Sequence, residues 1–165
     1  MPHIHEKIDY AADVYVVNDN AVLLRMHEKY GTWFPPGGHV ELDEDFVEAA
    51  LRETKEETGL DVTLIGALPD PVAEDTANLK IHDEREVLVP RFINRHRIND
   101  THEHISFEYF GRSETRDINP APGEKTDGFK WFTDSELEDP KFKVMDRVQL
   151  YAKAALRAAR EDESY

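Results

Sequence analysis

Between residues 31 and 60 the chain carries signals that restrict a helix to one short segment. The stretch GTWFPPGGHVE at 31–41 is too rich in proline and glycine for a helix and predicts a loop with a short extended piece. Asp43 or Asp45 is then a suitable N-cap, and Gly59 is a suitable C-cap. These signals predict a helix over residues 44–58.

The last part of this predicted helix reads RETKEETGL at residues 52–60 and carries glutamates at 53, 56 and 57. Like charges three and four residues apart repel one another on a helix. At 100° per residue the three carboxylates share one face, on a flank outside the core. We therefore expect either an ordinary solvated surface or a site for a cation. The predicted core-facing stripe consists of Val47, Ala50, Leu51, Thr54 and Thr58.

Segments typical of β-strands lie on both sides of the helix. Residues 8–17 and 21–28 are joined by Asn-Asp-Asn and predict an antiparallel hairpin. Further strands are predicted at 61–68, 86–97, 102–113 and 128–133, and Pro90 places the second of these at an edge or a bulge. Residues 69–84 and 114–127 read as polar, proline-containing connections.

Two helical segments close the sequence. A short turn capped by Thr133 or Asp134 is expected at SELED, and an amphipathic helix is expected at 143–160. The order of strands, helix, strands and helix predicts an α/β/α sandwich, of the α+β or α/β class, with a mixed β-sheet between helices. We expect a single domain over residues 1–165.

Composition excludes several classes of function. The 165 residues carry a formal net charge of −15, which argues against duplex nucleic acid as a partner. With no cysteine, disulfides, thiolate metal sites and cysteine nucleophiles are excluded. No run approaches the roughly 18 apolar residues of a membrane span, and the first residues lack a signal-peptide pattern. We expect a cytoplasmic protein without a membrane partner.

The spacing of the glycines and charged residues resembles the Nudix box, G-x5-E-x7-R-E-U-x-E-E-x-G-U, in which U is a bulky aliphatic residue. The entry sequence WFPPGG before it and the segment KWFTDSE near the C-terminus resemble that hydrolase family as well. At the first U position the chain has Thr54, whose hydroxyl we expect to bond to the carbonyl of Ala50. The positions that match are Gly38, Glu44, Arg52, Glu53, Glu56, Glu57, Gly59 and Leu60.

The resemblance implies a metal site, and the chemistry of the residues agrees with it. Mg²⁺ prefers carboxylate oxygens, water and phosphate, and glutamates at i, i+3 and i+4 present a patch of carboxylates. By resemblance Mg²⁺, with Mn²⁺ as the alternative, binds Glu56, Glu57 and the carbonyl of Gly37 or Gly38. Glu53 is then either a further ligand or the general base.

Two more groups of catalytic residues follow. We expect Arg52 to orient the site by pairing with Glu44 or Glu53. A further carboxylate from a later loop is favoured at Glu124, with Glu103, Glu108 and Asp127 as the competing candidates.

The sequence gives weaker signals for the residues that contact the substrate. Arg91 and Arg95 belong to the basic cluster of an acidic chain, and could bind phosphate or form a strand edge or a subunit contact. His102 and His104 alternate across Glu103 and could contact substrate or metal, but no third ligand lies near them in sequence. Trp33 either stacks on a base or packs in the core.

The resemblance implies a Mg²⁺-dependent pyrophosphohydrolase that cleaves a nucleoside diphosphate linked to another moiety. Its favoured substrate is a small nucleoside triphosphate, cleaved to a monophosphate and pyrophosphate. A non-catalytic nucleotide-sensing module on the same fold is the alternative. An isomerase of isoprenoid diphosphates would need a cysteine that the chain lacks. The partner is then a small nucleotide-type substrate, and a homodimer is left open.

Overall fold

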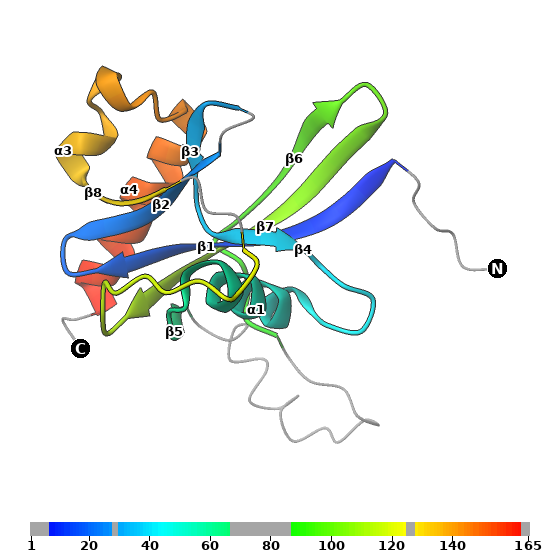
Figure 1. Ribbon diagram of the computed structural model, residues 1–165, viewed down its shortest axis with the longest axis horizontal. Coiled ribbons are helices and arrows are strands. Elements are labelled where there is room, and N and C mark those ends of the chain that lie inside the picture. Colours follow the sequence, from blue (N-terminus) through cyan, green and yellow to red (C-terminus); the bar gives the residue numbers. More distant parts are fainter. Residues whose placement is uncertain (1–6, 28–29, 67–86, 125–127, 163–165) are drawn as a thin grey trace.

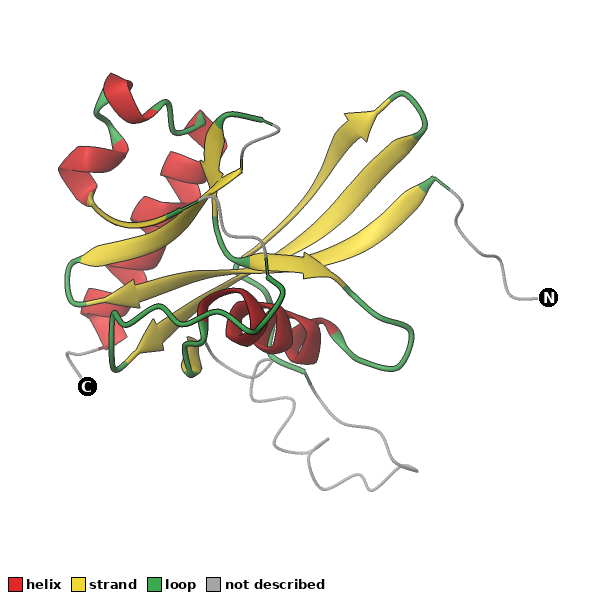
Figure 2. Cartoon of the chain, viewed as in Figure 1, coloured by secondary structure: helices red, strands yellow, loops and turns green. Residues whose placement is uncertain are grey.

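The computed structural model describes residues 7–27, 30–66, 87–124 and 128–162 (Figure 1). A mixed β-sheet forms the middle layer, and helices lie on its two faces (Figure 2). Within the described chain, no helix combines the length and apolar character needed to cross a bilayer.

The sheet is built around two long parallel strands, β1 (Ile8–Asn18) and β7 (His102–Ser113). On the side of β7 away from β1 lie β6 (Phe92–Asn99) and β5 (Val62–Ile65), both antiparallel to it. On the other side, β1 pairs with β2 (Ala21–His27) and β4 (Gly37–His39). Finally, β3 (Thr32–Phe34) and β8 (Phe129–Thr133) pair with β2. The predicted mixed sheet is therefore confirmed.

Successive side chains of β1 point to opposite faces of the sheet, and each face packs against one main helix. Ala12, Val14 and Val16 pack against Ala49 and Ala50 of α1 (Phe46–Thr58). On the opposite face, α4 (Asp146–Asp162) packs against Tyr15 and Val17 of β1. The buried residues of α4 in this cluster include Val148, Tyr151, Ala152, Ala155 and Leu156. The short helices α3 (Asp134–Leu137) and η1 (Pro140–Phe142) precede α4.

Local capping signals located the end of α1 correctly and its start to within two residues, since the helix predicted over 44–58 begins at Phe46. Asp45 is the N-cap and accepts hydrogen bonds from the amides of Val47 and Glu48, while Glu48 completes the capping box. Gly59 ends the helix with φ 75°. The hairpin between β1 and β2 is also confirmed, and its turn places Asp19 at φ 51°.

Several predicted boundaries are wrong. The strand predicted at 86–97 begins only at Phe92, because Pro90 cannot donate to a ladder and residues 87–91 are irregular. The closing helix begins at Asp146 rather than 143, because Lys143 takes a left-handed conformation with φ 53° after the turn at 140–142. The short extended piece predicted within the loop at 31–41 is present, but as two short strands, β3 and β4, rather than one. The whole of the connection predicted at 69–84 lies outside the described residues.

The buried face of α1 also differs from the predicted stripe. Ala50, Thr54 and Thr58 are buried as expected, but Leu51 is only half-buried and Ala49 is fully buried. The hydroxyl of Thr54 does not bond to Ala50; it is buried and has no hydrogen-bond partner within the described residues. An unpaired buried hydroxyl costs free energy without a compensating contact.

Replacing Thr54 with valine is therefore expected to stabilise the protein by about 1 kcal/mol, because it removes an unpaired polar group at nearly constant volume. Thr58→Val is the matched control. Its hydroxyl donates to the carbonyl of Thr54 at 2.6 Å and accepts the amide of Leu60 at 3.1 Å, so its loss should destabilise. Urea unfolding of both variants measures the difference, and a destabilised Thr54→Val would contradict the assignment.

Candidate active site

Two glycines bring strand β4 into direct contact with its neighbours. A Cβ atom on Gly37 would lie 2.4 Å from Oδ1 of Asp13, and one on Gly38 would lie 2.5 Å from Cδ of Glu53. At Gly37 a Cβ would also lie 2.5 Å from the carbonyl oxygen of Ala12, a backbone atom, and φ is 153°, so only glycine fits there. At Gly38 the crowding involves only the end of the Glu53 side chain, so glycine leaves room for that carboxylate to approach the backbone. The two glycines thus set carboxylates from β1 and α1 against the same short strand.

Arg52 holds three glutamates at once. Its guanidinium donates to both carboxylate oxygens of Glu44, at 2.9 and 2.7 Å, and to Oε1 of Glu53 at 2.9 Å. It also donates to Oε2 of Glu56 at 3.0 Å and to the carbonyl of His39 at 3.1 Å. The hydrogen bonds from Arg52 lower the pKa of Glu44. Of the two partners expected from sequence, Arg52 therefore uses both.

Glu57 is buried, which corrects the expectation that all three helix carboxylates lie outside the core. Its exposed fraction is 6%, because the strands β2 and β4 cover it. Oε2 accepts the amide of Gly37 at 3.1 Å, and Oε1 pairs with Arg25 at 3.0 Å. Burial raises the pKa of Glu57 to about 7, although Arg25 and the Gly37 amide act in the opposite direction.

Arg25 was missed by the sequence reasoning. The signal was an arginine in the middle of the apolar strand AVLLRMH, a position where a charge requires a partner. Together Arg25 and Arg52 supply two positive charges to the carboxylates of α1. The crowding of negative charge in RETKEETGL is thus partly offset within the protein itself.

The donor atoms of this cluster fit a hard divalent cation. Within the described chain, no hydrogen bond or ion pair engages Oε2 of Glu53 or Oε1 of Glu56, so each glutamate keeps one oxygen available. Burial raises the pKa of Glu53, which lies against the backbone of Gly38. Carboxylate and backbone oxygens are the ligands that Mg²⁺ and Mn²⁺ prefer.

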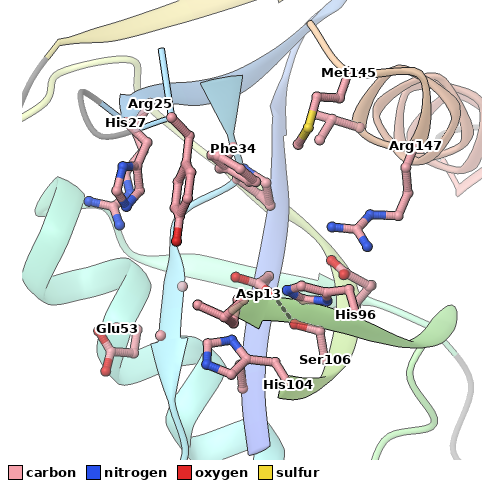
Figure 3. A pocket seen from close by; sticks show the side chains of 18 of the residues that line it. Asp13, Arg25, His27, Phe34, Glu53, His96, His104, Ser106, Met145 and Arg147 are labelled. Carbon is pink, nitrogen blue, oxygen red and sulfur yellow. Dashed lines mark hydrogen bonds between the residues drawn. The ribbon is translucent and has the colours of Figure 1, made fainter. Parts of the chain in front are cut away.

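A cavity of about 970 Å³ opens beside these residues. Figure 3 shows Glu53 of α1 on one side of it and Arg147 of α4 on the other, with Asp13 and Ser106 on the floor between them. Its aromatic wall includes Tyr30 and Phe34. The cavity therefore brings together α1, α4 and the polar part of one sheet face.

A buried polar network forms part of this floor, and sequence reasoning did not find it. Asp13 and Glu108 are paired positions on the parallel strands β1 and β7. Ser106 donates to Asp13 at 2.7 Å, and Asn94 donates to Glu108 at 2.7 Å while accepting from Arg147 at 3.0 Å. Burial raises the pKa of Asp13 to about 6 and that of Glu108 well above its usual value.

The remaining predicted site residues separate into two groups. His102 and His104 line the cavity. Trp33 instead packs against Phe132, with ring centroids 5.0 Å apart, and Arg91 and Arg95 do not line the cavity either.

The candidates for the additional carboxylate also separate. Glu124 is exposed, and its charge raises the pKa of Glu53 slightly. Glu103 pairs with Lys7 and Arg95 away from the cavity, whereas Glu108 lines it. Asp127 lies outside the described residues.

The raised pKa of Asp13 gives a prediction for stability. The folded protein holds the proton of the Asp13 carboxyl more tightly than the unfolded chain does. The contribution of this carboxyl to the free energy of unfolding is therefore fully present at low pH and is lost as pH rises from about 4 to about 6. Asp13→Asn removes this loss. Its free energy of unfolding, relative to wild type, should therefore rise by on the order of 2 kcal/mol between about pH 4 and about pH 7.

Urea unfolding at both pH values measures this double difference. Asp61→Asn is the control, since that side chain is 94% exposed and should show a much smaller change. A difference for Asp13→Asn that does not depend on pH would contradict the raised pKa.

Comparison with known proteins identifies relatives over most of the chain. A family model described as the NUDIX domain matches residues 7–154. A solved structure of a NUDIX-family hydrolase from Clostridium perfringens has a TM-score of 0.82 and 28% sequence identity. The alignment covers 93% of this chain and 98% of that one.

Two curated relatives match over shorter segments. The m7GpppN-mRNA hydrolase NUDT17 of Xenopus laevis is 44% identical over 57 residues, which are 32% of this chain and 19% of that protein. The asymmetrical bis(5'-nucleosyl)-tetraphosphatase of Mus musculus is 45% identical over 42 residues, which are 26% of this chain and 29% of that protein. The chain thus covers less than a third of the length of these curated relatives.

Proposed function

Since the chain belongs to the NUDIX domain family, as its box predicted, we propose that it is a Mg²⁺-dependent pyrophosphohydrolase. It would cleave a phosphoanhydride bond in a nucleoside diphosphate linked to another moiety. The observation that carries this proposal is the meeting of Glu53 and Glu57 with the glycines of β4 at the wall of one cavity. The charged positions of the box are all present, which favours an enzyme over a nucleotide-sensing module.

The metal ligands in this proposal are Glu56 and Glu57 with a backbone carbonyl of Gly37 or Gly38, and Glu53 is taken as the general base rather than as a further ligand. When bound, Mg²⁺ would screen the phosphate charges and lower the pKa of a water molecule. Arg52 keeps the carboxylates of Glu53 and Glu56 together, because it bonds to one oxygen of each. Glu44 in turn orients Arg52 through its two hydrogen bonds.

Proton removal from the attacking water is assigned to Glu53. Within the described residues its Oε2 makes no hydrogen bond or ion pair, so this atom can accept the proton. The carboxyl group lies against Gly38 at the cavity wall, where it can reach a water molecule beside a bound phosphate. Glu124 is retained only as a nearby carboxylate that the exposed loop could bring to the site.

Other cavity residues would bind the substrate. Arg147 points into the cavity from α4, across from Glu53, and offers a cation to the phosphates (Figure 3). Tyr30 and Phe34, whose ring centroids are 6.0 Å apart, offer a surface on which a base can stack. These residues replace Arg91, Arg95 and Trp33 as the favoured contacts, because they line the cavity and the others do not.

The cavity and the relatives together support a nucleotide substrate. The names of the two curated relatives refer to a capped mRNA and to a bis(5'-nucleosyl) tetraphosphate, and both contain nucleosides joined through several phosphates. A nucleoside triphosphate, cleaved to a monophosphate and pyrophosphate, is the simplest substrate that the cavity can accept. Dinucleoside polyphosphates are the second class to test.

A substrate panel tests this proposal. Nucleoside triphosphates, dinucleoside polyphosphates and nucleotide sugars are incubated with the protein and Mg²⁺, and products are separated by chromatography. Mg²⁺-dependent cleavage of a phosphoanhydride bond is expected with at least one class. Binding of nucleotides without turnover across the whole panel would favour the sensing module instead.

Substitution of individual glutamates tests the residue roles. Glu53→Gln should lower kcat on the order of 10²- to 10⁴-fold, the usual contribution of a general base. Glu56→Gln should raise the Mg²⁺ concentration needed for activity, because it removes an exposed ligand without disturbing the core.

Glu48→Gln is the matched control on the same helix, since glutamine preserves the capping box. Glu57→Gln is less informative, because it also removes the buried pair with Arg25. Unchanged kcat and unchanged Mg²⁺ dependence in both Glu53→Gln and Glu56→Gln would exclude these roles.

A further inference from the structure

Three histidines and an aspartate gather at one end of the cavity from three different strands. Asp9 on β1 and His104 on β7 are paired positions in the parallel ladder. His102 lies two residues before His104 and so shares its face. His39 on β4 is paired with Ala11, which lies two residues after Asp9 on β1. The register of the sheet therefore places all four side chains on one face.

The ligand atoms of these four residues converge on one point. One nitrogen from each histidine and one oxygen of Asp9 all lie within 4.8 Å of one another. Nε2 of His104 is 3.2 Å from Nε2 of His39 and 2.9 Å from Nε2 of His102. Oδ2 of Asp9 is 3.4 Å from Nε2 of His102 and 3.9 Å from Nε2 of His39.

These separations fit the edges of a coordination tetrahedron. Ligands about 2.0–2.1 Å from a tetrahedral Zn²⁺ stand about 3.3–3.4 Å from one another. Four of the six separations run from 2.9 to 3.9 Å and bracket this value, and the other two are within 4.8 Å. The atoms are thus already spaced so that a cation could fill the space between them.

Hydrogen bonding alone does not account for the cluster. Nε2 of His104 faces both Nε2 of His39 and Nε2 of His102. An imidazole nitrogen carries either one hydrogen or one lone pair, so it cannot form a good hydrogen bond with both neighbours. A cation that accepts one lone pair from each of the three rings would satisfy all three Nε2 atoms at once.

We propose that Asp9, His39, His102 and His104 bind one Zn²⁺ ion in a site separate from the glutamates of α1. Imidazole nitrogens select borderline transition metals, whereas carboxylate oxygens select Mg²⁺. The two sites share no ligand. The site goes beyond the proposed function, because zinc binding at these residues requires no hydrolytic activity.

The position of the site gives the ion access and a place in the cavity. The side chains of His39 and Asp9 are 61% and 48% exposed, so zinc can enter without unfolding the sheet. His39, His102 and His104 line the same cavity as Glu53 and Glu57, and His104 lies near Ser106 on its floor (Figure 3). A zinc ion there would add positive charge to a cavity that has to accept an anionic substrate.

Metal binding by the full chain tests the proposal. The protein is freed of metal with a chelator, and Zn²⁺ is titrated calorimetrically in the presence of excess Mg²⁺, which occupies the oxygen ligands. One equivalent of zinc is expected to bind. His39→Ala and His102→Ala should weaken this binding by more than about 100-fold, since even outer-shell partners of a metal contribute about 10- to 100-fold.

Two controls separate this site from other ligands. Glu56→Gln removes a carboxylate of α1, and His27→Gln removes a cavity histidine outside the cluster, so both should bind zinc as the wild type does. Because His39 is exposed, its alanine variant should fold, and circular dichroism confirms this.

Cobalt gives an independent readout of geometry. Co²⁺ in a four-coordinate site absorbs visible light far more strongly than octahedral Co²⁺, so wild type should show intense bands that His39→Ala loses. Absence of a zinc equivalent in excess Mg²⁺, or equal zinc binding by folded His39→Ala and His102→Ala, would overturn the proposal.

Discussion

The approach of the β4 backbone to helix α1 is the contact on which the rest of the site depends. At Gly37 a Cβ atom would collide with the backbone of β1, so β4 can pair with β1 in this way only because that residue is glycine, and at Gly38 the absent side chain leaves room for the Glu53 carboxylate. The Gly37 amide then donates to Glu57. One short strand therefore sets the distance between the cavity floor and the carboxylates of the helix.

Such closely packed carboxylates require compensation, and two arginines provide it. Arg52 bridges Glu44, Glu53 and Glu56 from within the helix, while Arg25 reaches Glu57 from β2. Removing one partner of a buried ion pair leaves an uncompensated charge and is strongly destabilising. The metal site proposed here is thus supported by the protein's own cations before any metal binds.

The polar face of the sheet continues this arrangement beyond the helix. Alternation along β1 places Asp9 and Asp13 on the same face, and Tyr15 follows them beneath α4. Apolar packing by α4 thus gives way to the acid network and then to the histidine cluster. The side chains on this face of β1 therefore form the core where α4 covers them and the cavity floor where it does not.

The sequence by itself determined the features that depend on neighbours along the chain. The caps at Asp45 and Gly59, the hairpin turn at Asp19, the strand His102–Ser113 and the family box were all predicted, because short-range hydrogen bonds and side-chain periodicity encode them. Two partners of Arg52, predicted as the alternatives Glu44 and Glu53, follow for the same reason, because both lie on or next to its own helix, whereas its contact with Glu56 was not predicted.

Only the tertiary structure decided which side chains meet across the sheet. The burial of Glu57, its pairing with Arg25 and the network of Asp13 with Ser106 join residues that are far apart in sequence. His39, which lies close to His102 and His104 and completes the proposed zinc site with Asp9, is 63 positions before His102 in the sequence. Strand register decides such contacts, and register is set by the packing of the whole sheet rather than by any local stretch.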